Sequence, residues 1–168
     1  GRSVNNGAAA RLRQVDVYHS TFTNNTNLSE TTGGGRALYT NDVAIYYSKF
    51  FNNYSTNDGG AIYSQGSNDI ISHCLIKNNT ADNYGGGIRG TSLKIYNSEI
   101  SYNTADNGGG IYATSSSIVN STIVNNNASA VSEGRNAGGI YGGYSVCNTI
   151  LWGNRAGSYV SNVRGKIH

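Results

Sequence analysis

Residues 108–126 read GGGIYATSSSIVNSTIVNN, and this stretch contains two short motifs that recur along the chain. The first motif, at residues 109–112, is a glycine pair followed by isoleucine and tyrosine. The second, at residues 121–126, is small-x-apolar-x-x-Asn. Motifs that recur at intervals of about 20–50 residues indicate a protein built from stacked repeats.

The second motif occurs six times, and its copies end at Asn25, Asn53, Asn79, Asn103, Asn126 and Asn154, which lie 28, 26, 24, 23 and 28 residues apart. Three apolar columns run through these copies. The first follows the glycine motif and comprises Ala10, Leu38, Ile62, Ile88, Ile111 and Ile140. The second comprises Val17, Ile45, Ile71, Ile95, Ile118 and Val146, and the third comprises Phe22, Phe50, Ile76, Ile100, Ile123 and Leu151.

Each repeat contains short β-type segments broken by Gly, Asn and Asp, and none has a long helical periodicity. Such a unit cannot bury its apolar side chains alone, but it can stack on its neighbour. The sequence therefore predicts an all-β fold: a single-stranded right-handed parallel β-helix with about six coils of 23–28 residues. We expect one domain over residues 1–168, with regular coils over about 7–154 and a strand-like tail over 155–168.

The asparagine that ends each copy is predicted to point inward and to link the coils through its side-chain amide, which both donates and accepts. Asparagine also tolerates left-handed backbone at a turn, and glycine pairs allow positive φ and tight strand entry. Most of the distinctive residues are thus expected to serve folding rather than chemistry.

Composition excludes several classes of protein. Charged residues make up 12% of the 168 residues, against about 25% in typical domains, so a coiled coil is excluded. Disorder is disfavoured because 37% of residues are apolar, 13 are Tyr and the net charge is only +3. No apolar run is long enough for a membrane-spanning helix, and this composition favours an extracellular or cell-surface protein.

Cysteine and N-glycosylation signals carry little information. Cys74 and Cys147 fall in different columns three coils apart, so we expect no disulfide between them. The Asn-x-Ser/Thr sequons occur about as often as chance predicts, so they do not indicate glycosylation; they lie at Asn24, Asn27, Asn53, Asn78, Asn120 and Asn127.

Alternating Gly-Gly-Ala-Ile and Phe-x-x-Asn motifs resemble the repeats of chlamydial polymorphic outer-membrane proteins and of bacterial secreted right-handed β-helix repeat proteins. Residues 148–154 (NTILWGN) are similar to the closing repeat of many of the latter. The resemblance covers roughly residues 7–154 and implies the same β-helix fold. These families include adhesins and surface-display modules, so it also implies an extracellular structural or adhesive role.

Three acidic residues are the candidates for metal binding or catalysis. Asp82 and Asp106 occupy the same turn position in successive coils, and Asp58 lies near it one coil earlier, which allows a low-affinity Ca²⁺ site. The alternative interpretation is ordinary turn chemistry, since Asp and Asn before Gly favour turns. No Arg or Lys shares their column, which disfavours a polysaccharide lyase. His19 and His73 share a column but lie two coils apart, too far to share a metal.

Outward-facing tyrosines are the candidate contact residues. Tyr39, Tyr63, Tyr112 and Tyr141 each follow the first apolar column, together with Arg11 and Arg89. Such rings offer apolar surface for sugars or for another protein. Stacked tyrosines can also serve only to stabilise a parallel sheet.

The sequence thus predicts a non-catalytic extracellular module with no cofactor, used as a structural or adhesive rod. The alternative is a polysaccharide-binding or polysaccharide-cleaving enzyme of the pectate-lyase-like type. We expect self-association through the coil ends, because neither end reads as a cap and an uncovered end exposes unpaired backbone groups. Surface glycans are the other expected partners; nucleic acid is not expected, because no basic stripe runs along one face.

Overall fold

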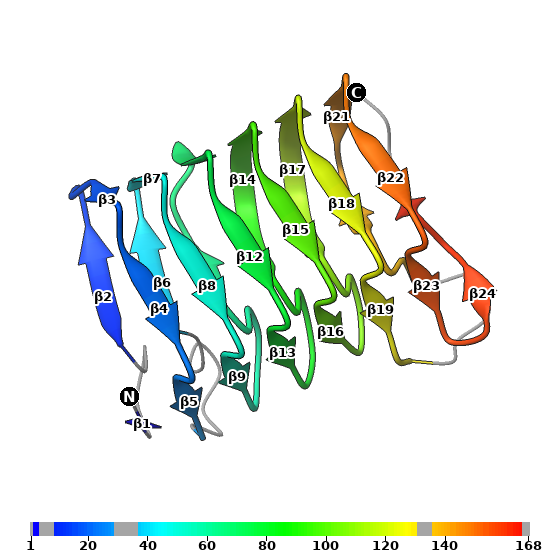
Figure 1. Ribbon diagram of the computed structural model, residues 1–168, viewed down its shortest axis with the longest axis horizontal. Helices are drawn as coiled ribbons and strands as arrows, with labels where there is room; N and C mark the ends of the chain where they lie inside the picture. Colours follow the sequence, from blue (N-terminus) through cyan, green and yellow to red (C-terminus); the bar gives the residue numbers. More distant parts are fainter. Residues whose placement is uncertain (1, 4–8, 29–36, 131–135, 166–168) are drawn as a thin grey trace.

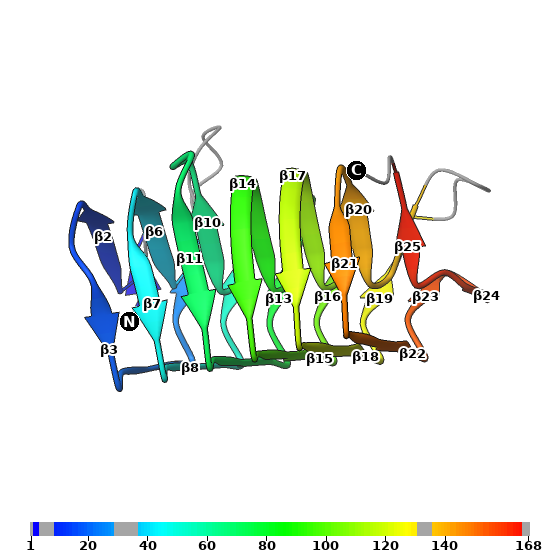
Figure 2. The same cartoon turned by 90° about the horizontal axis from the view of Figure 1, so that it is seen from above.

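A computed structural model describes residues 2–3, 9–28, 37–130 and 136–165, and the statements below concern these ranges. The chain coils into a rod of parallel strands, with the N-terminal end and the C-terminal tail at opposite ends (Figure 1). Viewed from above, the strands of successive coils lie side by side along the whole rod (Figure 2). None of the described residues forms a helix that is long and apolar enough to cross a membrane.

Three sheets run along the stacking axis within the described ranges. Sheet A contains β1 (Arg2–Ser3), β5 (Thr26–Asn27), β9 (Tyr54–Ser55), β13 (Thr80–Ala81), β16 (Thr104–Ala105), β19 (Asn127–Ala128), β23 (Arg155–Ala156) and β24 (Tyr159–Val160). Sheet B contains β2 (Ala10–Arg13), β3 (Val17–Tyr18), β6 (Leu38–Asn41), β7 (Ala44–Tyr46), β10 (Ile62–Ser64), β11 (Asp69–Ser72), β14 (Ile88–Tyr96), β17 (Ile111–Val119), β20 (Ile140–Gly142), β21 (Ser145–Cys147) and β25 (Val163–Arg164). Sheet C contains β4 (Thr21–Thr23), β8 (Lys49–Phe51), β12 (Leu75–Lys77), β15 (Glu99–Ser101), β18 (Thr122–Val124) and β22 (Ile150–Trp152).

The predicted β-helix is confirmed, and each predicted apolar column forms one ladder in register. Ile62, Ile88 and Ile111 pair directly on sheet B, and Ile76 pairs with Ile100 on sheet C. These side chains are fully buried, and burying one such side chain contributes about 1.5–3 kcal/mol. The three ladders together line the core of the rod.

The number of complete turns is slightly lower than predicted. Sheet C has six rungs in the described ranges, from β4 to β22, so the chain makes about five full turns between the first rung and the last. Residues 7 and 8 of the first expected coil, and residues 166–168 of the tail, lie outside the described ranges.

The inward asparagine column forms a continuous hydrogen-bonded ladder. Asn103 Oδ1 accepts from the backbone N–H of Asn79 at 2.9 Å and from its side-chain amide at 3.0 Å. Asn103 Nδ2 in turn donates to the carbonyl of Ile76 at 2.9 Å and to Asn126 Oδ1 at 3.0 Å. The same arrangement is repeated from Asn25 to Asn154, so each buried amide joins its coil to the next.

The left-handed backbone does not lie at these buried asparagines, and this part of the expectation is wrong. It lies one residue earlier, for example at Asn78 (φ 55°) and Tyr102 (φ 55°), both of which are exposed. A second left-handed column occurs at the corner between sheets B and C, for example at Tyr47 (φ 49°). The residue at the sharp bend must point outward so that the next side chain can turn in.

The glycine motif combines two different requirements. Gly85 has a φ of +67°, which favours glycine, whereas Gly86 leaves no room for a side chain. A Cβ atom on Gly86 would lie 2.2 Å from the carbonyl oxygen of Thr104 in the next coil. Gly85, which precedes the glycine pair of the motif, therefore sets the turn, and Gly86, the first glycine of that pair, allows the close approach of successive coils.

After Asn154 the described part of the chain forms the short strands β23, β24 and β25, and it folds back on its own coil. β24 pairs antiparallel with β23, and β25 pairs with β20. Asn162 Oδ1 accepts from Asn154 Nδ2 at 3.0 Å and thus continues the asparagine ladder. The tail covers sheet A and part of sheet B at this end, while β22 is the last strand of sheet C among the residues that the structure describes.

Asn103→Ala is expected to destabilise the fold by roughly 3 kcal/mol, because it leaves the backbone N–H of Asn79 and the carbonyl of Ile76 without this partner. The matched control is Asn78→Gly, at an exposed residue with positive φ, which should change stability by less than about 1 kcal/mol. Urea unfolding measures both. Similar losses in the two variants would contradict the role of the ladder.

Candidate contact surface

One outward column on sheet B is built almost entirely of arginine and tyrosine. Its members pair in register from coil to coil, and we call it the Arg–Tyr ladder: Arg11, Tyr39, Tyr63, Arg89, Tyr112, Tyr141 and Arg164. An arginine thus occurs at every third position, with two tyrosines between successive arginines. The column read from the sequence did not include Arg164. Its spacing from Tyr141 is nevertheless 23 residues, which equals the shortest spacing between successive copies of the asparagine motif.

The rings and guanidinium groups of this ladder stack on one another. The Arg89 guanidinium carbon lies 5.6 Å from the ring centre of Tyr63 and 5.0 Å from that of Tyr112. Tyr112 and Tyr141 stack at 5.0 Å with an interplanar angle of 12°. Each such cation–π contact contributes about 0.5–1 kcal/mol at an exposed site. The aromatic faces of the interior tyrosines stack on their neighbours in the ladder, so these rings present their edges to the solvent.

Tyr39 differs from the expectation of an outward contact residue. Its side chain is only 6% exposed, and its hydroxyl donates to the side-chain oxygen of Gln65. It also stacks on Tyr63 at 5.8 Å and lies under the guanidinium of Arg11. Tyr63, Tyr112 and Tyr141 are half-buried, so these three present the tyrosine surface that a partner can reach.

The three candidate acids are engaged in separate contacts. Asp82 accepts from the Tyr54 hydroxyl at 2.9 Å, and Asp106 accepts from the Ser129 hydroxyl at 2.7 Å. Among the residues that the structure describes, no group of three or more His, Cys, Asp or Glu side chains could hold a metal ion. Asp82 and Asp106 therefore act in coil-to-coil hydrogen bonding at the turn.

Asp58 lies beside the basic residue Arg89, although no Arg or Lys shares the column of the acidic residues. Its carboxylate is 3.8 Å from Arg89 Nε, and both side chains are about one-fifth exposed. The sequence columns hid this pair, because Asp58 lies at a turn while Arg89 lies on β14, and the coil brings them together. An acid, a base and the neighbouring phenol of Tyr112 meet here on the Arg–Tyr ladder.

The histidines lie where the columns predicted. His19, Tyr47 and His73 stack in order at the corner between sheets B and C, with ring centres 5.1 and 4.7 Å apart. Ser72 Oγ lies 2.9 Å from His73 Nδ1. The aromatic stack ends there, because the next residue of the column is Asn97.

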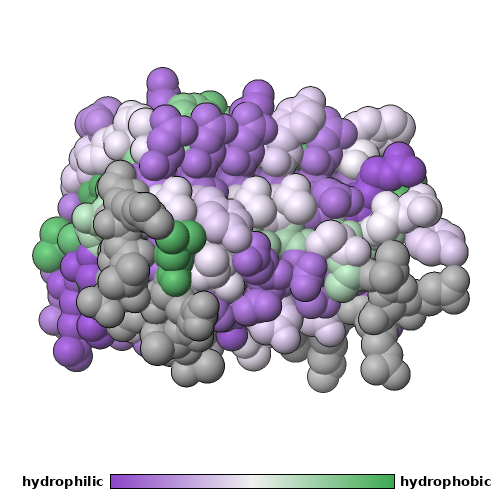
Figure 3. Space-filling model, turned by 90° about the horizontal axis from the view of Figure 1, so that it is seen from below, coloured by the Kyte–Doolittle hydropathy of each residue, from purple (hydrophilic) through white to green (hydrophobic). Residues whose placement is uncertain are grey.

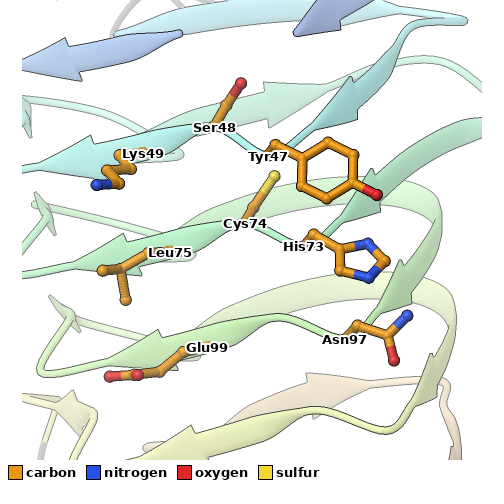
Figure 4. A pocket seen from close by; sticks show the side chains of 8 residues that line it. All are labelled: Tyr47, Ser48, Lys49, His73, Cys74, Leu75, Asn97 and Glu99. Carbon is orange, nitrogen blue, oxygen red and sulfur yellow. The ribbon is translucent and has the colours of Figure 1, made fainter. Parts of the chain in front are cut away.

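An open furrow of about 340 Å³ crosses three coils at this corner. One wall is the column Tyr47, His73, Asn97, and the other is the column Lys49, Leu75, Glu99 (Figure 4). Between them the chain turns inward at Ser48 and Cys74, which form the floor. The repeat pattern does not predict this furrow, although the alignment of the coils places its two charged residues, Lys49 and Glu99, two coils apart.

The face seen from below is largely hydrophilic, with rows of polar side chains along the axis and only small hydrophobic areas (Figure 3). Larger apolar side chains are exposed towards the C-terminal end, where Trp152 is 72% and Ile150 is 61% exposed. Both lie on β22, the last strand of sheet C in the described ranges.

Residues 48–65, 73–91 and 97–114 match the family model of the Chlamydia polymorphic membrane protein repeat. The matches fall in adjacent coils and cover less than half of the chain. Each begins near the corner before sheet C and runs through the glycine motif. They confirm the resemblance drawn from the motifs. No curated protein and no solved structure gave a significant match.

Cys147 is expected to react with a thiol reagent in the folded protein, whereas Cys74 is not. Both cysteines are free, but Cys147 is exposed and Cys74 is buried. Burial raises the pKa of the Cys74 thiol, so little reactive thiolate forms near neutral pH. Mass spectrometry after labelling in native buffer and in urea identifies the modified residue. Rapid native labelling of Cys74 would contradict its inward position.

The Arg–Tyr ladder should weaken at high pH. Burial, and secondly the nearby Tyr141, raise the pKa of Tyr112 above its ordinary value of about 10. A raised folded-state pKa contributes stability that is present below the unfolded-state value and lost as pH rises through the folded-state value. The free energy of unfolding should therefore fall above about pH 10, and less so in Tyr112→Phe. Identical pH profiles for the two proteins would contradict this assignment.

Proposed function

We propose that this chain is a non-catalytic structural or adhesive β-helix module that acts outside the cell or at its surface. The three repeat matches carry this proposal, because they relate adjacent coils to a repeat of membrane proteins. The structure is consistent with it, since the asparagines and glycines serve coil stacking. What remains outward is a long, regular surface suited to contacts with another molecule.

The Arg–Tyr ladder is the contact surface that we propose for adhesion. Its half-buried rings and guanidinium groups are already held in place by stacking, so binding costs little side-chain entropy. Tyrosine and arginine are also the residue types that contribute most often to protein interfaces. A protein or glycan on another surface is the expected partner.

Self-association through the coil ends is the second part of the proposal. The edge strand β22 carries the exposed side chains of Ile150 and Trp152, whereas β24 covers sheet A beside it. A neighbouring copy would add a strand to sheet C by backbone pairing. Sedimentation and electron microscopy of the isolated chain test this, and a monomer at all concentrations and salt levels would reject it.

Polysaccharide cleavage is retained as the alternative because Asp58, Arg89 and Tyr112 lie together on one face. The Asp58 carboxylate and the Tyr112 phenol are groups that general acid–base chemistry can use, and the Arg89 guanidinium, which stays charged, can bind an acidic sugar. The stacking of Arg89 between two tyrosine rings instead supports its place in an ordered contact surface, since the two rings hold the guanidinium in position.

The chain is expected to bind cell surfaces and to release no products from pectin, alginate or glycosaminoglycans. Arg89→Gln should reduce cell binding by about tenfold, equivalent to about 1.4 kcal/mol, because it removes the stacked cation. Lys94→Gln, at an exposed position on the same strand, is the matched control and should bind normally. Cell binding by flow cytometry and polysaccharide cleavage by chromatography give the two readouts. Cleavage that is lost in Asp58→Asn would establish the enzyme alternative instead.

A further inference from the structure

We propose that the furrow between the columns Tyr47–His73–Asn97 and Lys49–Leu75–Glu99 binds a neutral oligosaccharide. This inference names a ligand class for an adhesive module, and to that extent it rests on the proposed function. The furrow lies at the corner between sheets B and C, apart from the Arg–Tyr ladder on the face of sheet B. Its volume, about 340 Å³, falls at the lower end of the range for small-ligand sites, about 300–1,000 Å³.

The aromatic wall of the furrow ends in an open ring face. His19, Tyr47 and His73 stack along the axis, and the next position holds the short side chain of Asn97. The face of His73 towards this coil therefore carries no further ring of the stack. A sugar ring can take this place, since its C–H groups pack on an aromatic face while its hydroxyls remain free to form hydrogen bonds.

The side chains of the furrow offer hydrogen bonds of both kinds. Lys49 donates, Glu99 accepts, and the Asn97 amide and the Tyr47 hydroxyl do both. Within the described ranges, the side chains of Lys49 and Asn97 have no hydrogen-bond partner, so these groups are available to a ligand. A hydroxyl donates and accepts as well, and sugars carry several on each ring.

The charges of the furrow favour a ligand without net charge. Lys49 and Glu99 flank Leu75 in register, so they lie two coils apart, about 10 Å at about 4.8 Å per coil. The negative charge at one end offsets the positive charge at the other. A polyanion lying along the furrow would meet the carboxylate of Glu99 and be repelled.

The floor of the furrow argues against an extended peptide. The backbone N–H of Leu75 donates to the carbonyl of Ser48 at 3.0 Å, and that of Glu99 donates to the carbonyl of Cys74 at 2.9 Å. These groups are used between coils, so a peptide strand cannot pair with them as it does at a sheet edge. A ligand held by side chains along the axis, with rings that follow one another, fits this floor better.

Asn97→Tyr tests the site by extending the aromatic stack into the furrow. Tyrosine is compatible with the backbone there, because Tyr47 occupies the same column with a φ of 49° and Asn97 has a φ of 48°. The matched control is Asn120→Tyr, one coil further along this column and outside the furrow. Circular dichroism and thermal unfolding confirm that both variants are folded.

The probes are hexamers of β-1,4-linked glucose, β-1,4-linked N-acetylglucosamine and α-1,4-linked glucose, with polygalacturonate and heparin as charged comparators. Isothermal titration calorimetry should show that at least one neutral hexamer binds the natural chain more tightly than either polyanion. Asn97→Tyr and Glu99→Ala should each weaken this binding by about tenfold or more, while Asn120→Tyr binds normally.

The inference is overturned if no neutral hexamer binds, or if Asn97→Tyr and the natural chain bind equally. Preference for the polyanions would also overturn it. Cell binding measured in parallel separates this failure from that of the proposed function. If the natural chain binds cells but no hexamer, only the proposed ligand of the furrow is rejected. If the natural chain does not bind cells, the adhesive role itself is rejected.

Discussion

Each coil of this protein can form its backbone hydrogen bonds and bury its apolar side chains only against the adjacent coils. The register between coils therefore determines both the core and the arrangement of side chains on the surface. Paired residues of adjacent coils, such as Ile62 with Ile88 and Ile76 with Ile100, are of the same type, so equal side chains stack along the axis. The buried asparagines enforce this register, since each amide reaches both the backbone and the amide of its neighbours. A coil that slipped by one residue would leave these polar groups unpaired and turn its isoleucines outward.

The same register organises the surface. Outward residues at equal positions also stack, which places Arg89 between Tyr63 and Tyr112 and aligns the rings of Tyr47 and His73. In such a stack each aromatic face packs on the next one, so a ligand contacts mainly the edges of the rings. Binding faces become available where a stack is interrupted by a small residue. The furrow beside Asn97 is such an interruption, and it combines an open ring face with charged and polar side chains.

The acidic residues illustrate the difference between columns in a sequence and neighbours in space. Asp82 and Asp106 share a column, yet each accepts a hydrogen bond from a hydroxyl of a different adjacent coil. Asp58 shares no column with a base, yet it lies 3.8 Å from Arg89. The Asp58–Arg89 contact joins a turn to a strand, and it supplies a clear structural reason for Arg89 to be charged and held in place.

The amino-acid sequence by itself determined the β-helix, its three apolar ladders and its asparagine ladder, because one residue type recurring at each coil position directly encodes what stacks on what. It also located the outward tyrosines. Only the tertiary structure decided that Tyr39 is covered, that the left-handed residue precedes each buried asparagine, and that β24 folds back on β23. It alone brought Asp58 to Arg89 and opened the furrow between Lys49 and Glu99. These features depend on distances between different columns and on the path of the turns, which the spacing of repeats along the chain does not specify.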